Sequence, residues 1–213
     1  MRRILQVGYD FLKQWERGPR NNPNVRLTPD GAALDAYKCS AGKWTIGFGC
    51  TEYEDGSSVK KGDSITPDRV QPLLEYNIRR FEAYVDKHLA KGVSPFVFTA
   101  NVLLAYNIGC GNWLSSTVRR ESNEGNEYDA ASAYSMFTGS TTYAPTESQL
   151  NDPDFADFIG EDDDGNKVWV DPDSQPCGFM FRLRGLLARH HAEGCISLGL
   201  DWRQACADHR IRS

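Results

Sequence analysis

The sequence predicts an α+β fold that is mostly helical, with a small antiparallel β-sheet lobe and a long helix linking that lobe to the rest. Two observations predict it. Apolar residues recur at three- and four-residue spacing over several long stretches, as in amphipathic helices. Within residues 34–66, short apolar runs alternate instead with glycine turns, which is typical of an antiparallel sheet. At 213 residues we expect a single domain over 1–213.

The first half of the chain reads as helix, loop, sheet and helix. The first helix is expected over residues 3–16, and a loop rich in proline and asparagine follows at 17–31. After the sheet lobe, Thr66 is a plausible N-cap and Pro67 occupies the first helical position. From there an apolar stripe continues to residue 89, which predicts the long linking helix.

The second half contains more helices and one irregular segment. Residues 94–109 are apolar nearly all round, which predicts a buried central helix. Two shorter helices are expected at 112–123 and 128–138, and a last one at 177–199. Residues 139–177 lack a helical pattern and are rich in Asp, Pro, Gly, Ser and Thr. We therefore expect an irregular acidic surface insertion there.

Composition excludes several classes of protein. The net charge of −5 argues against a nucleic-acid groove, which requires an excess of Lys and Arg. No run approaches the length of a membrane span and no signal-peptide pattern follows Arg2 and Arg3, so we expect a soluble protein made in the cytoplasm. The six cysteines form no CxxC pair, which argues against a zinc site. We expect reduced thiols, with a Cys195–Cys206 disulfide as the alternative.

Glu16 is the candidate general acid. It follows Trp15 at the end of the first helix, just before Gly18 and Pro19 stop that helix. The negative end of the helix dipole and an apolar neighbour both favour the protonated carboxyl, which glycoside cleavage requires of its acid. Asp30 and Asp35 lie nearer the predicted hairpin in sequence, but neither ends a helix. An ordinary solvated role at a helix end is the alternative for Glu16.

Five segments follow one another along the chain: "QWERG", "DAYKCSAGKWTIGFGCT", "GDSIT", "ANVLLAYNIGCGNWLSSTVRR" and "RGLLARHHAEGCI". In sequence and in order they resemble the phage-type lysozymes, the endolysin family of glycoside hydrolases. The resemblance covers residues 4–138 and 178–198, and its glycine-rich hairpin is the most specific part. It implies a lysozyme-like fold.

The resemblance also implies roles for single residues. Glu16 matches the general acid of the family, Cys39 stands where the family has Asp or Cys, and Thr45 matches a threonine that orients water. With the acid on one side of the sugar and the other two residues on the opposite side, water can be held for an inverting attack. Four further residues match positions that border the substrate: Gly47, Gly49, Asn107 and Thr117. Arg189 and Glu193 are expected to form a structural salt bridge.

The sequence departs from the family at two places. Twenty-two residues separate Glu16 from Cys39, many more than in most members, and the excess coincides with the 17–31 loop. Cys50 stands where many members have His. For Cys39 three roles stay open: a base, a thiol that orients water, or a packed residue with no role. A thiol nucleophile would need a partner histidine, and all four histidines lie far from it in sequence.

The resemblance implies an endolysin that hydrolyses the β-1,4 bond between N-acetylmuramic acid and N-acetylglucosamine in bacterial peptidoglycan, and so lyses the host when phage infection ends. No metal or other cofactor is implied, and we expect a monomer with no stable membrane association. Access to the wall would require a holin, so the protein would pass from the host cytoplasm to the periplasm and cell wall. The alternatives are a lytic transglycosylase acting on the same bond, and an inactive peptidoglycan-binding or virion protein.

Overall fold

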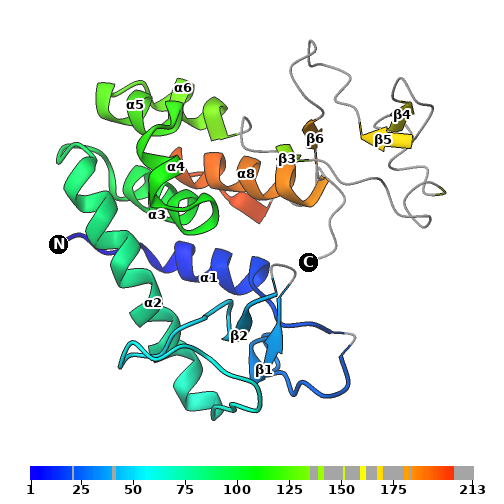
Figure 1. Ribbon diagram of the computed structural model, residues 1–213. Coiled ribbons are helices and arrows are strands. Elements are labelled where there is room, and N and C mark those ends of the chain that lie inside the picture. Colours follow the sequence, from blue (N-terminus) through cyan, green and yellow to red (C-terminus); the bar gives the residue numbers. More distant parts are fainter. Residues whose placement is uncertain are drawn as a thin grey trace.

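The computed structural model describes residues 1–20, 22–39, 42–134 and 184–203, with residue 151 and four three-residue strands. Its helices and strands form two lobes joined by α2 (Pro67–His88), as Figure 1 shows. A sheet lobe lies around one end of α2, and a lobe of helices lies around the other. This arrangement agrees with the predicted α+β fold and its linking helix.

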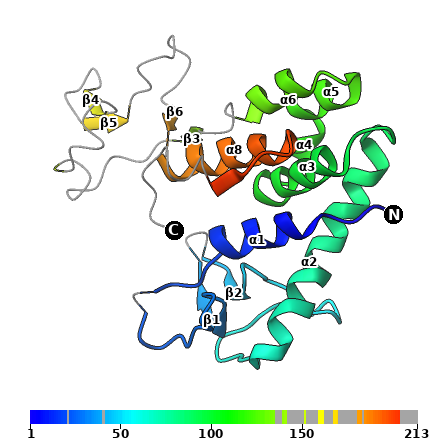
Figure 2. The ribbon, with the colours of Figure 1, turned by 180° about the vertical axis from the view of Figure 1, so that it is seen from behind.

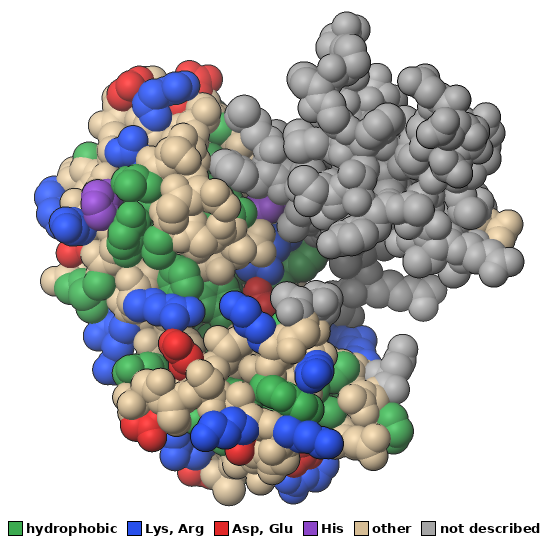
Figure 3. Space-filling model, in the orientation of Figure 1, with side chains coloured by type: hydrophobic (Ala, Val, Ile, Leu, Met, Phe, Trp, Pro, Cys, Tyr) green, Lys and Arg blue, Asp and Glu red, His purple; other side chains and the backbone are tan. Residues whose placement is uncertain are grey.

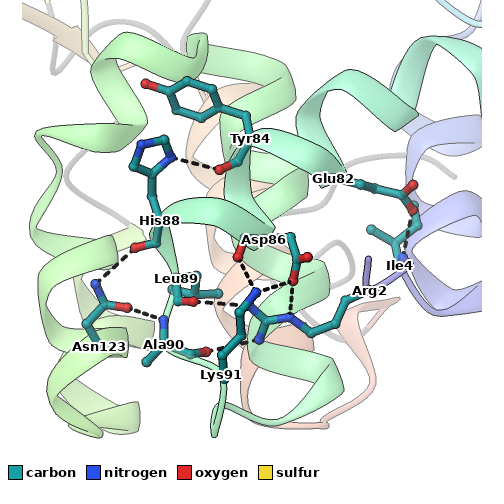
Figure 4. Close-up of polar contacts among 10 residues, drawn as sticks. All are labelled: Arg2, Ile4, Glu82, Tyr84, Asp86, His88, Leu89, Ala90, Lys91 and Asn123. Carbon is teal, nitrogen blue, oxygen red and sulfur yellow. Dashed lines mark hydrogen bonds and ion pairs between the residues drawn. The ribbon is translucent and has the colours of Figure 1, made fainter.

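The first helix, α1 (Gln6–Trp15), lies between α8 (Arg184–Ser197) and the sheet lobe in both ribbon views (Figure 1 and Figure 2). It begins three residues later than predicted, and before it Arg2 and Ile4 are bound to α2 (Figure 4). Arg2 Nε lies 2.8 Å from Asp86 Oδ1, and its other nitrogens donate to carbonyl groups just past the end of α2. Glu82, whose side chain is fully buried, accepts from the backbone N–H of Ile4 at 2.9 Å. These contacts fix the start of the chain against α2.

The sheet lobe is built on one hairpin, within the predicted 34–66 region. Strand β1 (Ala33–Lys38) pairs antiparallel with β2 (Trp44–Gly47), with Tyr37 opposite Thr45. The chain around the hairpin adds isolated bridges rather than a third strand. A small apolar cluster closes the lobe against α2, and its buried members are Ile46, Cys50, Val59 and Leu73.

The two longest predicted helices are confirmed. Helix α2 begins at Pro67 as predicted, although the Thr66 side chain makes no capping hydrogen bond. Helix α3 (Pro95–Ile108) is capped by Ser94, whose hydroxyl oxygen accepts from the N–H of Val97. Most of α3 is buried, as its apolar sequence predicts.

The single helix predicted at 112–123 is wrong, because two helices occupy this stretch. Helix α4 (Cys110–Leu114) ends before Ser116, and α5 (Thr117–Glu124) begins after it. The Ser116 hydroxyl accepts from the N–H of Arg119 and so starts a new helix. Helix α6 (Glu127–Ala133) confirms the start of the helix predicted at 128–138, whose residues 135–138 lie outside those described.

The helix predicted at 177–199 is confirmed over residues 184–197 and is wrong at residues 180–182. Met180–Arg182 form strand β6, which pairs antiparallel with β3 (Gly139–Thr141). Within the predicted irregular insertion at 139–177, β4 (Ile159–Glu161) also pairs with β5 (Lys167–Trp169). Most other residues of 139–177 lie outside those described. So does Cys206 of the alternative disulfide, while Cys50 and Cys110 form no disulfide.

Helix α8 packs on α3 and α6 and so completes the helical lobe. It crosses α6 closely: a β-carbon on Gly194 would lie 2.9 Å from the carbonyl oxygen of Ala131. Among the described helices, none is both long enough and apolar enough to cross a membrane.

Candidate active site

Glu16 ends α1, as predicted. Its backbone N–H still donates to the carbonyl of Leu12 at 2.8 Å, but its own backbone has left the helical conformation. The side chain is 22% exposed, so the carboxylate is partly withdrawn from water. Its carboxylate is bound by α8 and lies close to the end of the hairpin.

Arg189 of α8 binds this carboxylate directly. Its Nη1 lies 2.8 Å from Oε1 of Glu16, and the arginine side chain is only 8% exposed. Burial lowers the pKa of Arg189, but the carboxylates of Glu16 and Glu193 outweigh burial, so the pKa is raised and the guanidinium stays charged. Its Nη2 has no hydrogen-bond partner among the described residues. This Nη2 atom is also buried, so it is not exposed to solvent in the structure.

A buried chain of polar contacts continues behind Arg189. Its Nε lies 3.4 Å from Oε1 of Glu193, which confirms the predicted salt bridge. The other Glu193 oxygen lies 2.7 Å from Nδ1 of His190, and the His190 Nε2 lies 3.4 Å from the Asn107 amide nitrogen. Glu193 and His190 are fully buried. Asn107 therefore joins the site through His190 rather than through a described contact with Glu16.

Gly49, the predicted hairpin glycine, lies close to the side chain of Glu16. Its φ is +77°, and a β-carbon there would lie 3.0 Å from Oε2 of Glu16. The same β-carbon would lie 3.3 Å from the hydroxyl oxygen of Tyr106, which donates to the carbonyl of Phe48 at 3.3 Å. Tyr106 of α3 therefore bonds to the hairpin beside the carboxylate. Sequence reasoning did not identify Tyr106.

Tyr37 lies within electrostatic range of both the candidate acid and Cys39. Burial raises the pKa of Tyr37 to about 12, and the charge of Glu16, followed by any negative charge on Cys39, acts on this pKa in the same direction. Both groups are therefore electrostatic neighbours of one phenol. Thr45, directly opposite Tyr37 in the hairpin, is 3% exposed, and its hydroxyl donates to the carbonyl of Lys43 at 3.2 Å.

Two other predicted substrate-binding residues lie elsewhere. The nearest atoms to a β-carbon on Gly47 would be the side chains of Ile65 and Leu73, each at 3.9 Å, so Gly47 faces the core of the sheet lobe. Thr117 is the first residue of α5, and none of the contacts described for it reaches Glu16. The structure therefore groups Glu16 with Gly49 and leaves Gly47 and Thr117 outside this group.

Cys50, at the position where the resembling family has His, is a packed thiol. It is 1% exposed, and its Sγ lies 3.8 Å from the carbonyl oxygen of Phe48. Burial, followed by the charge of Glu16, raises its pKa to about 12. Cys50 is therefore uncharged at neutral pH and takes up no proton from a substrate.

The alternative acids are engaged in other contacts. Asp35 forms a two-pronged ion pair with Arg26, at 2.7 and 2.9 Å, and this hydrogen bonding lowers the pKa of Asp35. A lowered pKa is the opposite of what a general acid requires. Asp30 lies near Lys13, with 3.7 Å between the charged atoms. Within the described part of the chain, no group of three or more His, Cys, Asp or Glu side chains is arranged to hold a metal ion.

Comparisons with known proteins agree with this picture. A family model for phage lysozyme matches residues 28–143, more than half of the chain. The endolysin of Acyrthosiphon pisum secondary endosymbiont phage 1 is 31% identical over 107 residues, which is 50% of this chain and 69% of that protein. The endolysin of Salmonella phage P22 is 32% identical over 108 residues, which is 51% of this chain and 74% of that protein.

A solved structure extends the likeness to nearly the whole chain. The endolysin from Escherichia coli O157:H7 phage FAHEc1 has a TM-score of 0.61 at 26% identity, covering 92% of this chain and 93% of that one. Glu16 and Arg189 both lie outside the residues that the family model matches. Their pairing is thus an observation of this structure, independent of that match.

Proposed function

The chain belongs to the phage lysozyme family, and from this premise we propose that it is an endolysin that hydrolyses the β-1,4 bond between N-acetylmuramic acid and N-acetylglucosamine in bacterial peptidoglycan. One observation carries the proposal to particular residues: the Glu16 carboxylate ends α1, held by Arg189 and facing the glycine-rich hairpin. Glu16 is the only partly exposed carboxylate among the three acids considered whose neighbours come from both lobes.

In this proposal Glu16 protonates the oxygen of the leaving sugar. Cys39 and Thr45 hold the attacking water on the opposite side of the bond, as an inverting hydrolase requires. The Thr45 hydroxyl donates its hydrogen to the carbonyl of Lys43, so its oxygen lone pairs are the part of the group that is left to accept a hydrogen bond from the attacking water. The flexibility of glycine at Gly49 lets the hairpin backbone approach Glu16 and the bound sugar closely.

The charge distribution supports binding to the wall. Ten acidic residues and one basic residue fall within 139–177, so the rest of the chain carries a net positive charge. Lys and Arg side chains are exposed over the sheet lobe in Figure 3. Because the peptide stems of peptidoglycan carry carboxylates, these side chains would attract it. We propose a monomer that reaches this substrate after a holin has opened the host membrane.

The test of Glu16 is the substitution Glu16→Gln, which keeps the shape of the side chain and removes the transferable proton. We expect clearing of a cell-wall suspension to fall at least a hundredfold, in line with the contribution of general acids. Glu54→Gln, at an exposed ion pair with Arg69, is the matched control and should clear at the rate of the unmodified protein. Equal clearing by Glu16→Gln would remove Glu16 from the mechanism, whereas an absence of clearing by the unmodified protein would favour the inactive binding protein.

The transglycosylase alternative is separated by the products. A hydrolase leaves reducing muramic acid ends, whereas a transglycosylase closes an anhydro ring without water. Cys39 and Thr45, with their capacity to hold water, favour hydrolysis. Mass spectrometry of digested peptidoglycan should find reducing ends, and anhydro ends as the main product would establish the transglycosylase.

A further inference from the structure

We propose that Glu193 is a positioning residue for the reaction: its buried carboxylate offsets the charge of Arg189, so that Arg189 orients Glu16 without holding it in the ionised form. The inference rests on the proposed function, since it takes Glu16 to be the general acid. In this proposal Glu193 does not contact the substrate and acts on Glu16 through Arg189.

The arrangement around Glu16 raises a chemical conflict. A general acid must hold a proton before the reaction, and a guanidinium at 2.8 Å favours the carboxylate that has lost it. The Arg189 side chain is 8% exposed, so water does little to screen its charge. Arg189 alone would therefore make Glu16 a poor acid near neutral pH.

Glu193 resolves this conflict through charge. Its fully buried Oε1 lies 3.4 Å from Nε of Arg189, so the guanidinium lies between two carboxylates. With Glu16 ionised, the three groups carry a net charge of minus one, and with Glu16 protonated they carry none. Because net charge is costly to bury, the neutral arrangement with a proton on Glu16 is favoured.

His190 holds Glu193 in place. The Asn107 amide nitrogen donates toward Nε2 of the His190 ring at 3.4 Å. The His190 Nδ1 lies 2.7 Å from Oε2 of Glu193, so a hydrogen on Nδ1 binds this carboxylate oxygen. One Glu193 oxygen is thus bound by His190 and the other by Arg189, which leaves the carboxylate a fixed orientation.

Three tyrosines and one cysteine that face this cluster are uncharged at neutral pH. Burial raises the pKa of Tyr37 and Cys50, from the hairpin side, to about 12, and raises that of Tyr106, from α3, well above 10. On the far side, burial raises the pKa of Tyr134, which follows α6, well above 10. On α1 itself, Lys13 is directed to Asp30. Among these neighbours, Arg189 and Glu193 are the charges that set the protonation of Glu16.

The test is Glu193→Gln, which keeps the volume and removes the charge. Arg189 is then uncompensated, so Glu16 loses its proton at lower pH. We expect the alkaline limb of the kcat/KM profile to move down by about one pH unit, the size expected of one nearby charge, with activity recovered in more acidic buffer. The conservative Glu193→Asp retains the charge and should keep the limb near its original position.

A measurement without substrate separates this inference from the proposed function. The side-chain carboxyl carbon of Glu16, assigned in ¹³C NMR by its loss in Glu16→Gln, should titrate at correspondingly lower pH in Glu193→Gln. An unchanged or raised titration would overturn the role of Glu193. Full activity of Glu16→Gln would instead refute the general acid, while the NMR comparison would still decide the effect of Glu193.

Two further variants guard against a merely structural effect. Glu82→Gln removes another fully buried carboxylate, which is paired with Arg3 on the other side of the helical lobe. Glu82→Gln should reduce the stability of the protein without moving the alkaline limb of the kcat/KM profile. If Glu193→Gln does not fold, the double variant Arg189→Gln/Glu193→Gln removes both charges and leaves the net charge of the cluster unchanged. The alkaline limb of the kcat/KM profile of this double variant should stay within about half a pH unit of that of the unmodified protein. A shift of a full unit would overturn the inference.

Discussion

The carboxylate of Glu16 rests against the backbone of Gly49, with 3.0 Å between its Oε2 and the position that a β-carbon on Gly49 would occupy. A contact of 3.0 Å is tighter than nine in ten β-carbon contacts in proteins, so Glu16 would have to shift by a few tenths of an ångström to admit a β-carbon here. The φ of +77° independently favours glycine at this position. The end of the hairpin thus gives the candidate acid a backbone surface to lie on.

Gly49→Ala should therefore damage both stability and activity. We expect about 1–2 kcal/mol of lost unfolding free energy from the left-handed backbone alone, and at least a tenfold loss of wall clearing because Glu16 is displaced. Gly56→Ala is the matched control, since its φ is +80° and its β-carbon would have nothing within 4 Å. Urea denaturation should show a loss for both variants, and clearing should fall only for Gly49→Ala.

Arg189→Met should unfold much more easily than the unmodified protein. It leaves Glu193 buried without its cationic partner, and breaking a buried pair in this way costs about 3–5 kcal/mol. The deficit in urea denaturation should shrink in acid, where the stranded carboxylates take up protons. Arg120→Met breaks an ion pair in which the arginine is 59% exposed, and it should change stability little. Similar losses for the two variants would contradict the view of Arg189 as the buried cation of the site.

The parts of the fold that the sequence predicts well are those set by local signals. Helices α2 and α3 follow continuous apolar patterns that begin at Thr66–Pro67 and Ser94–Pro95. The hairpin follows its glycines and alternating residues. The break between α4 and α5 was also local, since the Ser116 cap is an N-terminal signal, but the surrounding helical pattern obscured it.

The parts that the sequence does not predict depend on distant partners. Met180–Arg182 form a strand because they pair with residues 139–141, whereas their own pattern continues into a helix. In the site, the four-residue spacing of Arg189 and Glu193 predicts their pairing, but nothing local relates Arg189 to Glu16 across 173 positions. Tyr106 was missed for the same reason, since its contact at Phe48 joins α3 to the hairpin.

Cys39 should be replaceable by the residue that the family has at this position. If the side chain orients water or accepts its proton, Cys39→Asp should keep clearing activity within about tenfold, because a carboxylate does either task. Cys39→Ala should be at least a hundredfold weaker. The rates of wall clearing at equal concentrations of folded protein give the comparison. Undiminished activity of Cys39→Ala would leave the thiol without a catalytic part.

Asp86 should make the free energy of unfolding depend on pH in the acidic range. Hydrogen bonds from Arg2 and Lys91 lower its pKa from 3.8 to about 2 (Figure 4). Because the folded pKa lies below the unfolded one, the stabilisation is complete above about pH 4 and is lost as the pH falls through 2. Asp86→Asn should therefore cost about 1–2 kcal/mol at pH 7. In thermal or urea unfolding the two proteins should converge near pH 2, and a constant difference would contradict this role.

Residues 16 and 189 leave the ribosome far apart in time. With synthesis at about 5–20 residues per second, a growing chain carries Glu16 for roughly 9–35 s before Arg189 is added 173 positions later. Until then the carboxylate has neither the guanidinium that orients it nor the neighbour that balances that guanidinium. A nascent chain that ends before Arg189 therefore lacks the contacts that complete the candidate site.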